Sequence, residues 1–115
     1  MYIEQHSRYQ NKANNIQLRY DDKQFHTTVI KDVLLWIEHN LDQSLLLDDV
    51  ANKAGYTKWY FQRLFKKVTG VTLASYIRAR RLTKAAVELR LTKKTILVIA
   101  LKYQFDSQQS FTRRF

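Results

Sequence analysis

The sequence contains no cysteine and no proline, and only two glycines occur among its 115 residues. Without cysteine the chain has no disulfide and no thiolate metal site, which fits a reducing cytoplasm. Without proline and with so little glycine, a chain that is 45% hydrophobic is expected to be all-α with few loops. The longest apolar run, Ile96 to Leu101, is far too short to cross a bilayer. We therefore expect a helical cytoplasmic protein with no membrane partner.

Acidic residues are scarce in the second part of the chain. Residues 1–52 hold five Lys or Arg against eight Asp or Glu, whereas residues 53–115 hold fifteen against two. Such a basic region creates a potential that attracts polyanions, and its contribution to binding weakens steeply with salt. The charge distribution therefore favours a nucleic acid or another polyanion as the partner.

The residues that catalysis and metal binding require are also few. The three histidines, His6, His26 and His39, are each expected on the surface. The sequence shows no His-x-x-x-His pattern, no paired carboxylates placed for catalysis and no glycine-rich phosphate loop. We assign no catalytic residue, no metal ligand and no cofactor, and an enzyme is the least favoured class.

A short basic helix that follows a tight turn, in residues 55–70, is the most informative feature present. Apolar residues at i, i+3, i+4 and i+7 predict one stripe facing a core, with Thr57 as the N-cap and Gly70 at a left-handed end. An outward face with arginine, glutamine and lysine is typical of the recognition helix of a helix-turn-helix unit. The alternative is the solvated face of an ordinary surface helix, although an exposed tryptophan argues for a partner. The inward residues are Phe61, Leu64, Phe65 and Val68, and the outward ones are Trp59, Gln62, Arg63 and Lys66, with Lys58 and Lys67 beside them.

The rest of the chain divides around this helix. Residues 1–26 show no sustained period and are expected to form a flexible N-terminal arm. Residues 27–115 are expected to form one domain. Its parts are a first helix-turn-helix unit in residues 28–70, with helices from Thr28 and over Leu47 to Ala54, a linker helix in residues 72–91 and a second unit in residues 95–115.

The second unit repeats the first at an offset of 49 residues before the turn and 50 after it. A linker of 20 residues spans about 30 Å, close to the roughly 34 Å between successive major grooves on one side of a DNA duplex. A monomer would then bind an asymmetric site. The repeat pairs Ala51 with Ala100, Tyr56 with Phe105, Phe61 with Phe111, Arg63 with Arg113 and Phe65 with Phe115, and it turns Gln108, Gln109 and Thr112 outward.

Over residues 28–115 the sequence resembles the DNA-binding domain of the AraC/XylS family of regulators, in its single-domain subgroup. The blocks that carry the resemblance lie at residues 55–59, 62–67, 76–78 and 107–113. The resemblance implies a transcriptional activator that binds double-stranded DNA in adjacent major-groove segments and contacts RNA polymerase. It also implies base-edge contacts for Trp59, Gln62, Arg63, Gln108, Gln109 and Arg113, and phosphate contacts for Lys58, Lys66 and Thr112.

Three features depart from the family pattern. Leu46 stands where a Ser or Thr cap is common, so the helix that follows is expected to fray. Gln104 stands where glycine is usual, and it would be strained if the backbone keeps a positive φ. The sequence ends at Phe115, inside the expected second recognition helix, so the last helix of the family is expected to be absent and the cover over Ile96 and Ile99 to be reduced.

A competing hypothesis follows from the apparent shortening. The basic half would then give weak or non-specific binding to nucleic acid, to RNA or to an anionic surface, without activation. An RNA-binding platform and a membrane-surface helix both expose aromatic side chains. The inward positions expected for Phe61, Phe65, Phe111 and Phe115 argue against both.

Overall fold

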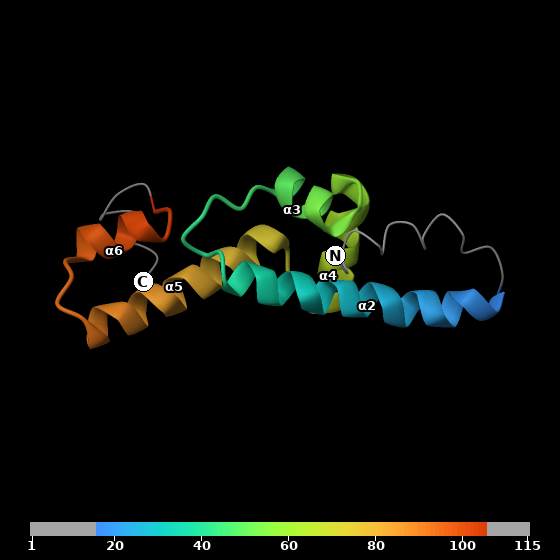
Figure 1. Ribbon diagram of the computed structural model, residues 1–115, viewed down its shortest axis with the longest axis horizontal. Coiled ribbons are helices and arrows are strands. Elements are labelled where there is room, and N and C mark those ends of the chain that lie inside the picture. Colours follow the sequence, from blue (N-terminus) through green and yellow to red (C-terminus); the bar gives the residue numbers. More distant parts are fainter. Residues whose placement is uncertain (1–15, 106–115) are drawn as a thin grey trace.

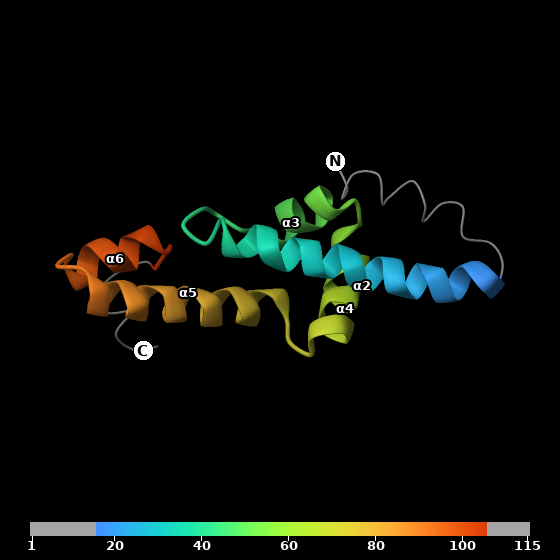
Figure 2. The same ribbon diagram turned by 60° about the horizontal axis from the view of Figure 1, so that its bottom comes forward.

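The computed structural model describes residues 16–105, and side chains are described from Lys23 onward. Within that range the chain forms α-helices and no strand, so the predicted all-α class is confirmed. Figures 1 and 2 show α3 and α4 packed around α2, while α5 extends beyond the end of α2 and carries α6 alongside its far part. The helices are α2 (Ile16–Glu38), α3 (Leu47–Ala54), α4 (Lys58–Thr69), α5 (Leu73–Leu91) and α6 (Ile96–Lys102).

The first described helix, α2, begins at Ile16 and not at the predicted Thr28. Residues 16–26, assigned from the sequence to a flexible arm, are therefore helical, and residues 1–15 lie outside the described residues. The hydroxyl of Thr28 does not cap a helix, because it donates to the carbonyl of Gln24 one turn earlier, at 2.9 Å. The buried stripe also continues backward from Ile30 to His26, which is 7% exposed.

The first helix-turn-helix unit forms where it was predicted. Gly55 ends α3 with φ 85°, and the N–H of Tyr56 donates to the carbonyl of Ala51 at 3.0 Å. Glycine enters this left-handed region without strain, so the chain can reverse sharply, and α4 starts three residues after Gly55. Thr57 caps α4 by accepting from the N–H of Tyr60, whereas Leu46 gives α3 no side-chain cap, as expected.

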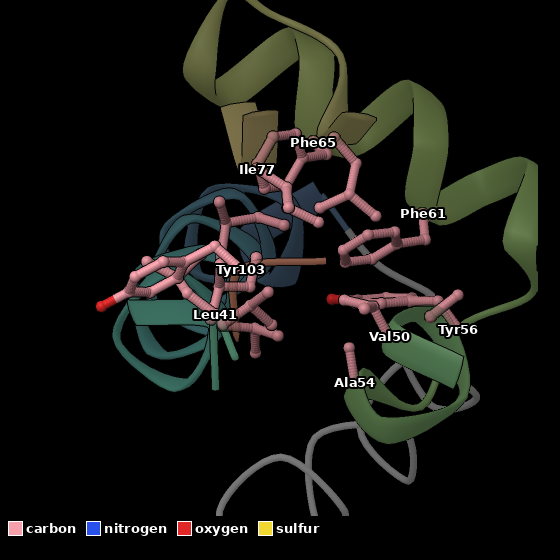
Figure 3. Close-up of a cluster of buried hydrophobic side chains, with 14 of the residues drawn as sticks. Leu41, Val50, Ala54, Tyr56, Phe61, Phe65, Ile77 and Tyr103 are labelled. Carbon is pink, nitrogen blue, oxygen red and sulfur yellow. The ribbon is translucent and has the colours of Figure 1, made fainter. Parts of the chain in front are cut away.

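One contiguous core holds the unit against α2 and α5. Phe61 and Phe65 are completely buried, and Figure 3 shows them beside Tyr56, Val50 and Ile77. Burial of one such phenylalanine contributes roughly 1.5–3 kcal/mol. These side chains fix the rotation of α4, and its remaining face points to solvent.

The linker helix α5 runs without a break over 19 residues, which corresponds to about 28 Å. Thr72 caps it, as predicted, by accepting from the N–H of Ser75. Leu73 and Ile77 pack in the core near the first unit, and Ala85 is buried further along. One rigid element therefore connects the two units.

The described part of the second unit repeats the turn of the first. Thr95 caps α6, and Gln104 takes φ 67° where the first unit has Gly55. The N–H of Phe105 donates to the carbonyl of Ala100 at 2.9 Å, which matches the bond from Tyr56 to Ala51. Ile99 keeps its cover at 0% exposure, contrary to expectation. The surface of α6 carries an exposed apolar patch, and its members Ile96, Leu97, Val98 and Leu101 are 40%, 46%, 52% and 53% exposed.

Candidate nucleic-acid interface

The position of α4 is set by a row of aromatic rings on its inner side. Tyr56 and Phe61 have ring centroids 6.4 Å apart, Phe61 and Phe65 5.8 Å, and Phe65 and Tyr76 5.8 Å. Such tilted contacts are favourable and directional, so they resist rotation of the helix about its axis. The row links the turn before α4, two successive turns of α4 and the first turn of α5.

The outward face of α4 carries the predicted side chains in one exposed strip. Trp59 is 66% exposed, and Gln62, Arg63 and Lys66 are all exposed. Among the described residues, no hydrogen bond or ion pair involves the side chain of Gln62, Arg63 or Lys66. Polar groups in this arrangement keep their hydrogen-bonding capacity for an external partner.

Lys58, a predicted phosphate contact, has two neighbours within the chain. Its Nζ lies 3.7 Å from the Oδ1 of Asp48 and 5.0 Å from the ring centroid of Trp59. Both members of the ion pair are well exposed, so the pair contributes little stability and exchanges readily. The ammonium group of Lys58 also lies over the ring of Trp59, so a positive charge and an apolar surface are adjacent at the start of the strip.

Two arginines of α5 have hydrogen-bond partners within the chain. Arg80 donates from Nε and Nη2 to the two carboxylate oxygens of Glu38, each at 2.9 Å. The hydrogen bond from Arg80 lowers the pKa of Glu38, and Lys84 adds a contact at 3.4 Å. Arg81 donates to the carbonyls of Leu41 and Gln43, and burial lowers the pKa of its guanidinium. These arginines hold α2 and the following loop against the linker.

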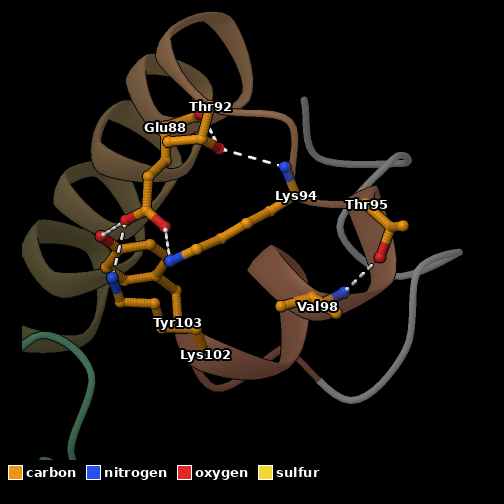
Figure 4. A network of polar contacts seen from close by, with 7 residues as sticks. All are labelled: Glu88, Thr92, Lys94, Thr95, Val98, Lys102 and Tyr103. Carbon is orange, nitrogen blue, oxygen red and sulfur yellow. Dashed lines mark hydrogen bonds and ion pairs between the residues drawn. The ribbon is translucent and has the colours of Figure 1, made fainter.

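A second charged cluster joins α5 to α6, as Figure 4 shows. Glu88 accepts at Oε1 from Lys102 at 2.8 Å and from the hydroxyl of Tyr103 at 2.6 Å, and Lys94 approaches Oε2 at 3.4 Å. The hydrogen bonds from Lys102 and Tyr103 lower the pKa of Glu88 to about 2. In residues 53–105 Glu88 is the one acid of the sequence, and its charge is used to anchor the second unit.

Sequence analysis did not predict a polar contact between α2 and the helix-turn-helix unit. His26 is buried, its Nδ1 lies 2.5 Å from the hydroxyl of Tyr56, and its Nε2 lies 3.3 Å from the hydroxyl of Tyr60. The expectation of a surface histidine was therefore wrong. The signal was available, because His26 stands four residues before Ile30 and seven before Val33 on the buried stripe.

The remaining predicted contacts belong to the second recognition segment. Gln108, Gln109, Thr112 and Arg113 lie outside the described residues.

Within residues 16–105 no helix is both long and apolar enough to pass through a membrane. No group of three potential metal ligands occurs in that same part of the chain.

Comparison with known proteins decides the family. Residues 50–115 match the helix-turn-helix domain family, and the whole chain is 97% identical to the transposon Tn10 TetD protein of Escherichia coli, of which it covers 83%. The chain belongs to the AraC family of helix-turn-helix transcription regulators. It is also 51% identical over 104 residues to the transcriptional activator AarP of Providencia stuartii, covering 89% of this chain and 77% of that one.

A solved structure confirms the architecture of an AraC-type domain. The transcriptional regulator with an AraC-type DNA-binding domain from Chromobacterium violaceum superposes with a TM-score of 0.70 at 29% identity. The match covers 75% of this chain and 77% of that one. The right origin-binding protein of Escherichia coli is 63% identical over 87 residues, which are 76% of this chain but only 30% of that much longer protein. Family membership makes this chain a DNA-binding regulator of transcription, and the relatives from Providencia stuartii and Chromobacterium violaceum are named a transcriptional activator and a transcriptional regulator.

Proposed function

We propose that this chain is a sequence-specific activator of transcription that binds double-stranded DNA as a monomer. In this proposal α4 enters one major-groove segment and residues 107–115 enter the next. The observation that carries it is the strip on α4, where the exposed side chains of Gln62, Arg63 and Lys66 make no hydrogen bond or ion pair among the described residues while the opposite face is locked in the core. The length of α5, about 28 Å, suits the roughly 34 Å between successive grooves.

The residues of the strip divide by chemistry into two roles. Arg63 and Gln62 offer paired groups to base edges, and Trp59 offers an apolar surface and a ring N–H. Lys58 and Lys66 are cations at the sides of α4 and are assigned to phosphates. In the second segment Gln108, Gln109 and Arg113 are assigned to base edges and Thr112 to a phosphate, as the family resemblance implies.

Activation is proposed to proceed through contact with RNA polymerase. The relative from Providencia stuartii is named a transcriptional activator, which supports this mode. The proposal is tested by transcription with purified polymerase from a template carrying the bound site. Added protein should raise transcript yield at that template and leave a template with a scrambled site unchanged. An unchanged or lower yield at the bound site would show that DNA binding does not activate.

The central test replaces Arg63 by alanine. Loss of a bidentate base contact is expected to weaken binding to the selected site by about 1–3 kcal/mol and to change binding to random duplex very little. Lys67→Ala is the matched control, because it removes one exposed positive charge from the same helix. The control should weaken binding to both duplexes alike.

Binding titrations on both duplexes at one salt concentration give the comparison. Equal losses for Arg63→Ala on the two duplexes would assign Arg63 to a phosphate and would favour non-specific binding by the basic half. Sedimentation of the complex tests the monomer, because one chain per site is expected. A second chain on the same site would reject that part of the proposal.

A further inference from the structure

The loop between α2 and α3 connects the two helix-turn-helix units through three consecutive carbonyl groups. Arg81 of α5 donates from Nε to the carbonyl of Leu41 at 3.0 Å and from Nη2 to that of Gln43 at 2.6 Å. The side-chain amide of Gln104 donates to the carbonyl between them, that of Asp42, at 2.9 Å. Gln104 belongs to the turn of the second unit, so this bond joins the second unit directly to the first.

The backbone of Gln104 is in a conformation that disfavours its own side chain. Its φ of 67° lies in the left-handed region, where the equivalent residue of the first unit is Gly55 at φ 85°. A non-glycine residue is uncommon in this region and carries a conformational cost. The Gln104 side chain thus adds strain to its own turn, while its amide reaches the neighbouring unit.

The second unit would have more freedom without this bond. Its other polar anchor is the cluster around Glu88, which lies on α5 and holds Lys102 and Tyr103. Apolar packing of Ile99 and Ala100 is non-directional, so a single polar anchor on one side of α6 restrains rocking only weakly. Gln104 supplies a second anchor on a different element, because Asp42 lies in the loop that Arg81 holds.

We propose that Gln104 is a positioning residue that fixes the second unit relative to the first and thereby sets the spacing between half-sites that the protein accepts. The inference rests on the proposed binding of two groove segments by one chain. Each added base pair moves the second half-site by about 3.4 Å and rotates it by about 35°. A rigid protein rejects such a displacement, whereas a protein with a free second unit follows it.

The experiment measures binding of the full chain to a selected DNA site and to variants with one or two base pairs inserted between its halves. The ratio of affinities for native and altered spacing is compared for the unmodified protein, Gln104→Gly and Gln104→Glu. Gln104→Gly removes the amide and relieves the positive φ, so it is expected to fold. Gln104→Glu keeps the size and the strained backbone but has no N–H to donate.

Both substitutions should lower the spacing ratio by about 3- to 10-fold, as loss of one intramolecular hydrogen bond predicts. The extra negative charge of Gln104→Glu weakens binding to every duplex, but it cancels in the ratio. Gln104→Lys, which restores a donor of sufficient length, should recover part of the ratio. Thermal unfolding checks that each variant is folded, and Gln104→Gly is expected to be as stable as the unmodified chain or more so.

The outcomes separate this inference from the proposed function. A sharp spacing preference in the unmodified chain that persists in Gln104→Gly and Gln104→Glu would overturn the positioning role and leave bipartite DNA binding intact. If the unmodified chain shows no preference for sequence or spacing, the proposed function itself fails, and the inference fails with it. Reduced spacing preference in both variants, with sequence preference within the first half-site unchanged, supports the positioning role.

Discussion

The two helix-turn-helix units share a turn but depend on different interactions. Both turns close with the same backbone hydrogen bonds, from Tyr56 to Ala51 in the first unit and from Phe105 to Ala100 in the second. The first unit is held by apolar burial beneath α2, with Phe61 at its centre. The second also buries Ile99 and Ala100 in the core, and in addition the charged cluster around Glu88 joins it to α5. The repeated sequence pattern therefore gives a repeated backbone and a repeated apolar core, to which the second unit adds charged contacts.

The surfaces of α3 and α6 explain why the second unit needs polar anchors. In α3 the exposed positions are polar, including Asp48 and Asp49, so burial alone selects which face turns inward. In α6 the exposed positions include Leu97, Val98 and Leu101, so apolar residues surround the helix. Hydrophobicity therefore distinguishes the faces of α6 less sharply than those of α3, and the bonds to Glu88 help to specify its rotation.

The largest effect is expected from breaking the apolar core of the first unit with Phe61→Ala. Phe61 is fully buried, and removal of such a side chain leaves a cavity that costs about 3–5 kcal/mol. Urea denaturation monitored by circular dichroism measures the loss in free energy of unfolding. Because small domains have only about 5–15 kcal/mol of stability, the variant should be close to unfolding at 37 °C.

The matched change in the second unit is Val98→Ala on the apolar surface of α6. Val98 is 52% exposed, so its truncation should change the free energy of unfolding by less than about 0.5 kcal/mol. A loss for Val98→Ala as large as that for Phe61→Ala would contradict the contrast, because it would place Val98 in a packed interior.

The next effect is expected from Glu88→Gln, which removes the charge at the centre of the second unit's anchor. At neutral pH the free energy of unfolding should fall by about 1–2 kcal/mol, since bonds to a charged acceptor are lost while Lys94 and Lys102 remain partly exposed to solvent. The folded pKa of Glu88 is about 2 against an ordinary value of 4.5. The stabilisation is therefore complete above about pH 4.5 and is lost as the pH falls toward 2.

Denaturation of the unmodified chain and of Glu88→Gln at several pH values isolates this contribution, because other carboxylates titrate alike in both. The stability difference should shrink between pH 4.5 and pH 2. Glu38→Gln removes the corresponding bridge from α2 to Arg80 and serves as the comparison. If the difference in free energy of unfolding between the unmodified chain and Glu88→Gln stays constant from pH 4.5 to pH 2, the ionised carboxylate of Glu88 does not stabilise the fold.

The features that the sequence predicted are those that local spacing determines. The stripe of Phe61 and Phe65, the threonine caps and the positive φ of Gln104 all depend on residues within one or two helical turns. The exposed strip of α4 followed from the same spacing, since a helix that buries one face presents the other. The assignment of individual side chains in that strip to bases and phosphates remains a prediction.

The features that the sequence did not predict depend on residues far apart in the chain. The helix start was misplaced because threonine is equally suited to a cap and to a bond back to the preceding turn, as Thr28 shows. The sequence does not reveal the partners of Arg80 and Arg81, because Glu38 and Leu41 stand 42 and 40 residues earlier in the chain. His26 was missed for the same reason, since Tyr56 approaches it only in the folded chain.

The smallest effect is expected from improving α3, which among α3, α4, α5 and α6 is the one helix whose N-cap residue makes no side-chain hydrogen bond. Leu46 has the extended backbone of an N-cap, φ −78° and ψ 147°, yet its side chain is 62% exposed and accepts no hydrogen bond. Leu46→Ser should therefore raise the free energy of unfolding by about 0.5–1 kcal/mol, because the hydroxyl would accept from a free N–H in the first turn. Thr95→Ala, which removes the corresponding cap from α6, should lower it by a similar amount. If Leu46→Ser is destabilising, Leu46 must contribute more through apolar contact than its exposure indicates, and the first unit would then depend on burial even at its helix ends.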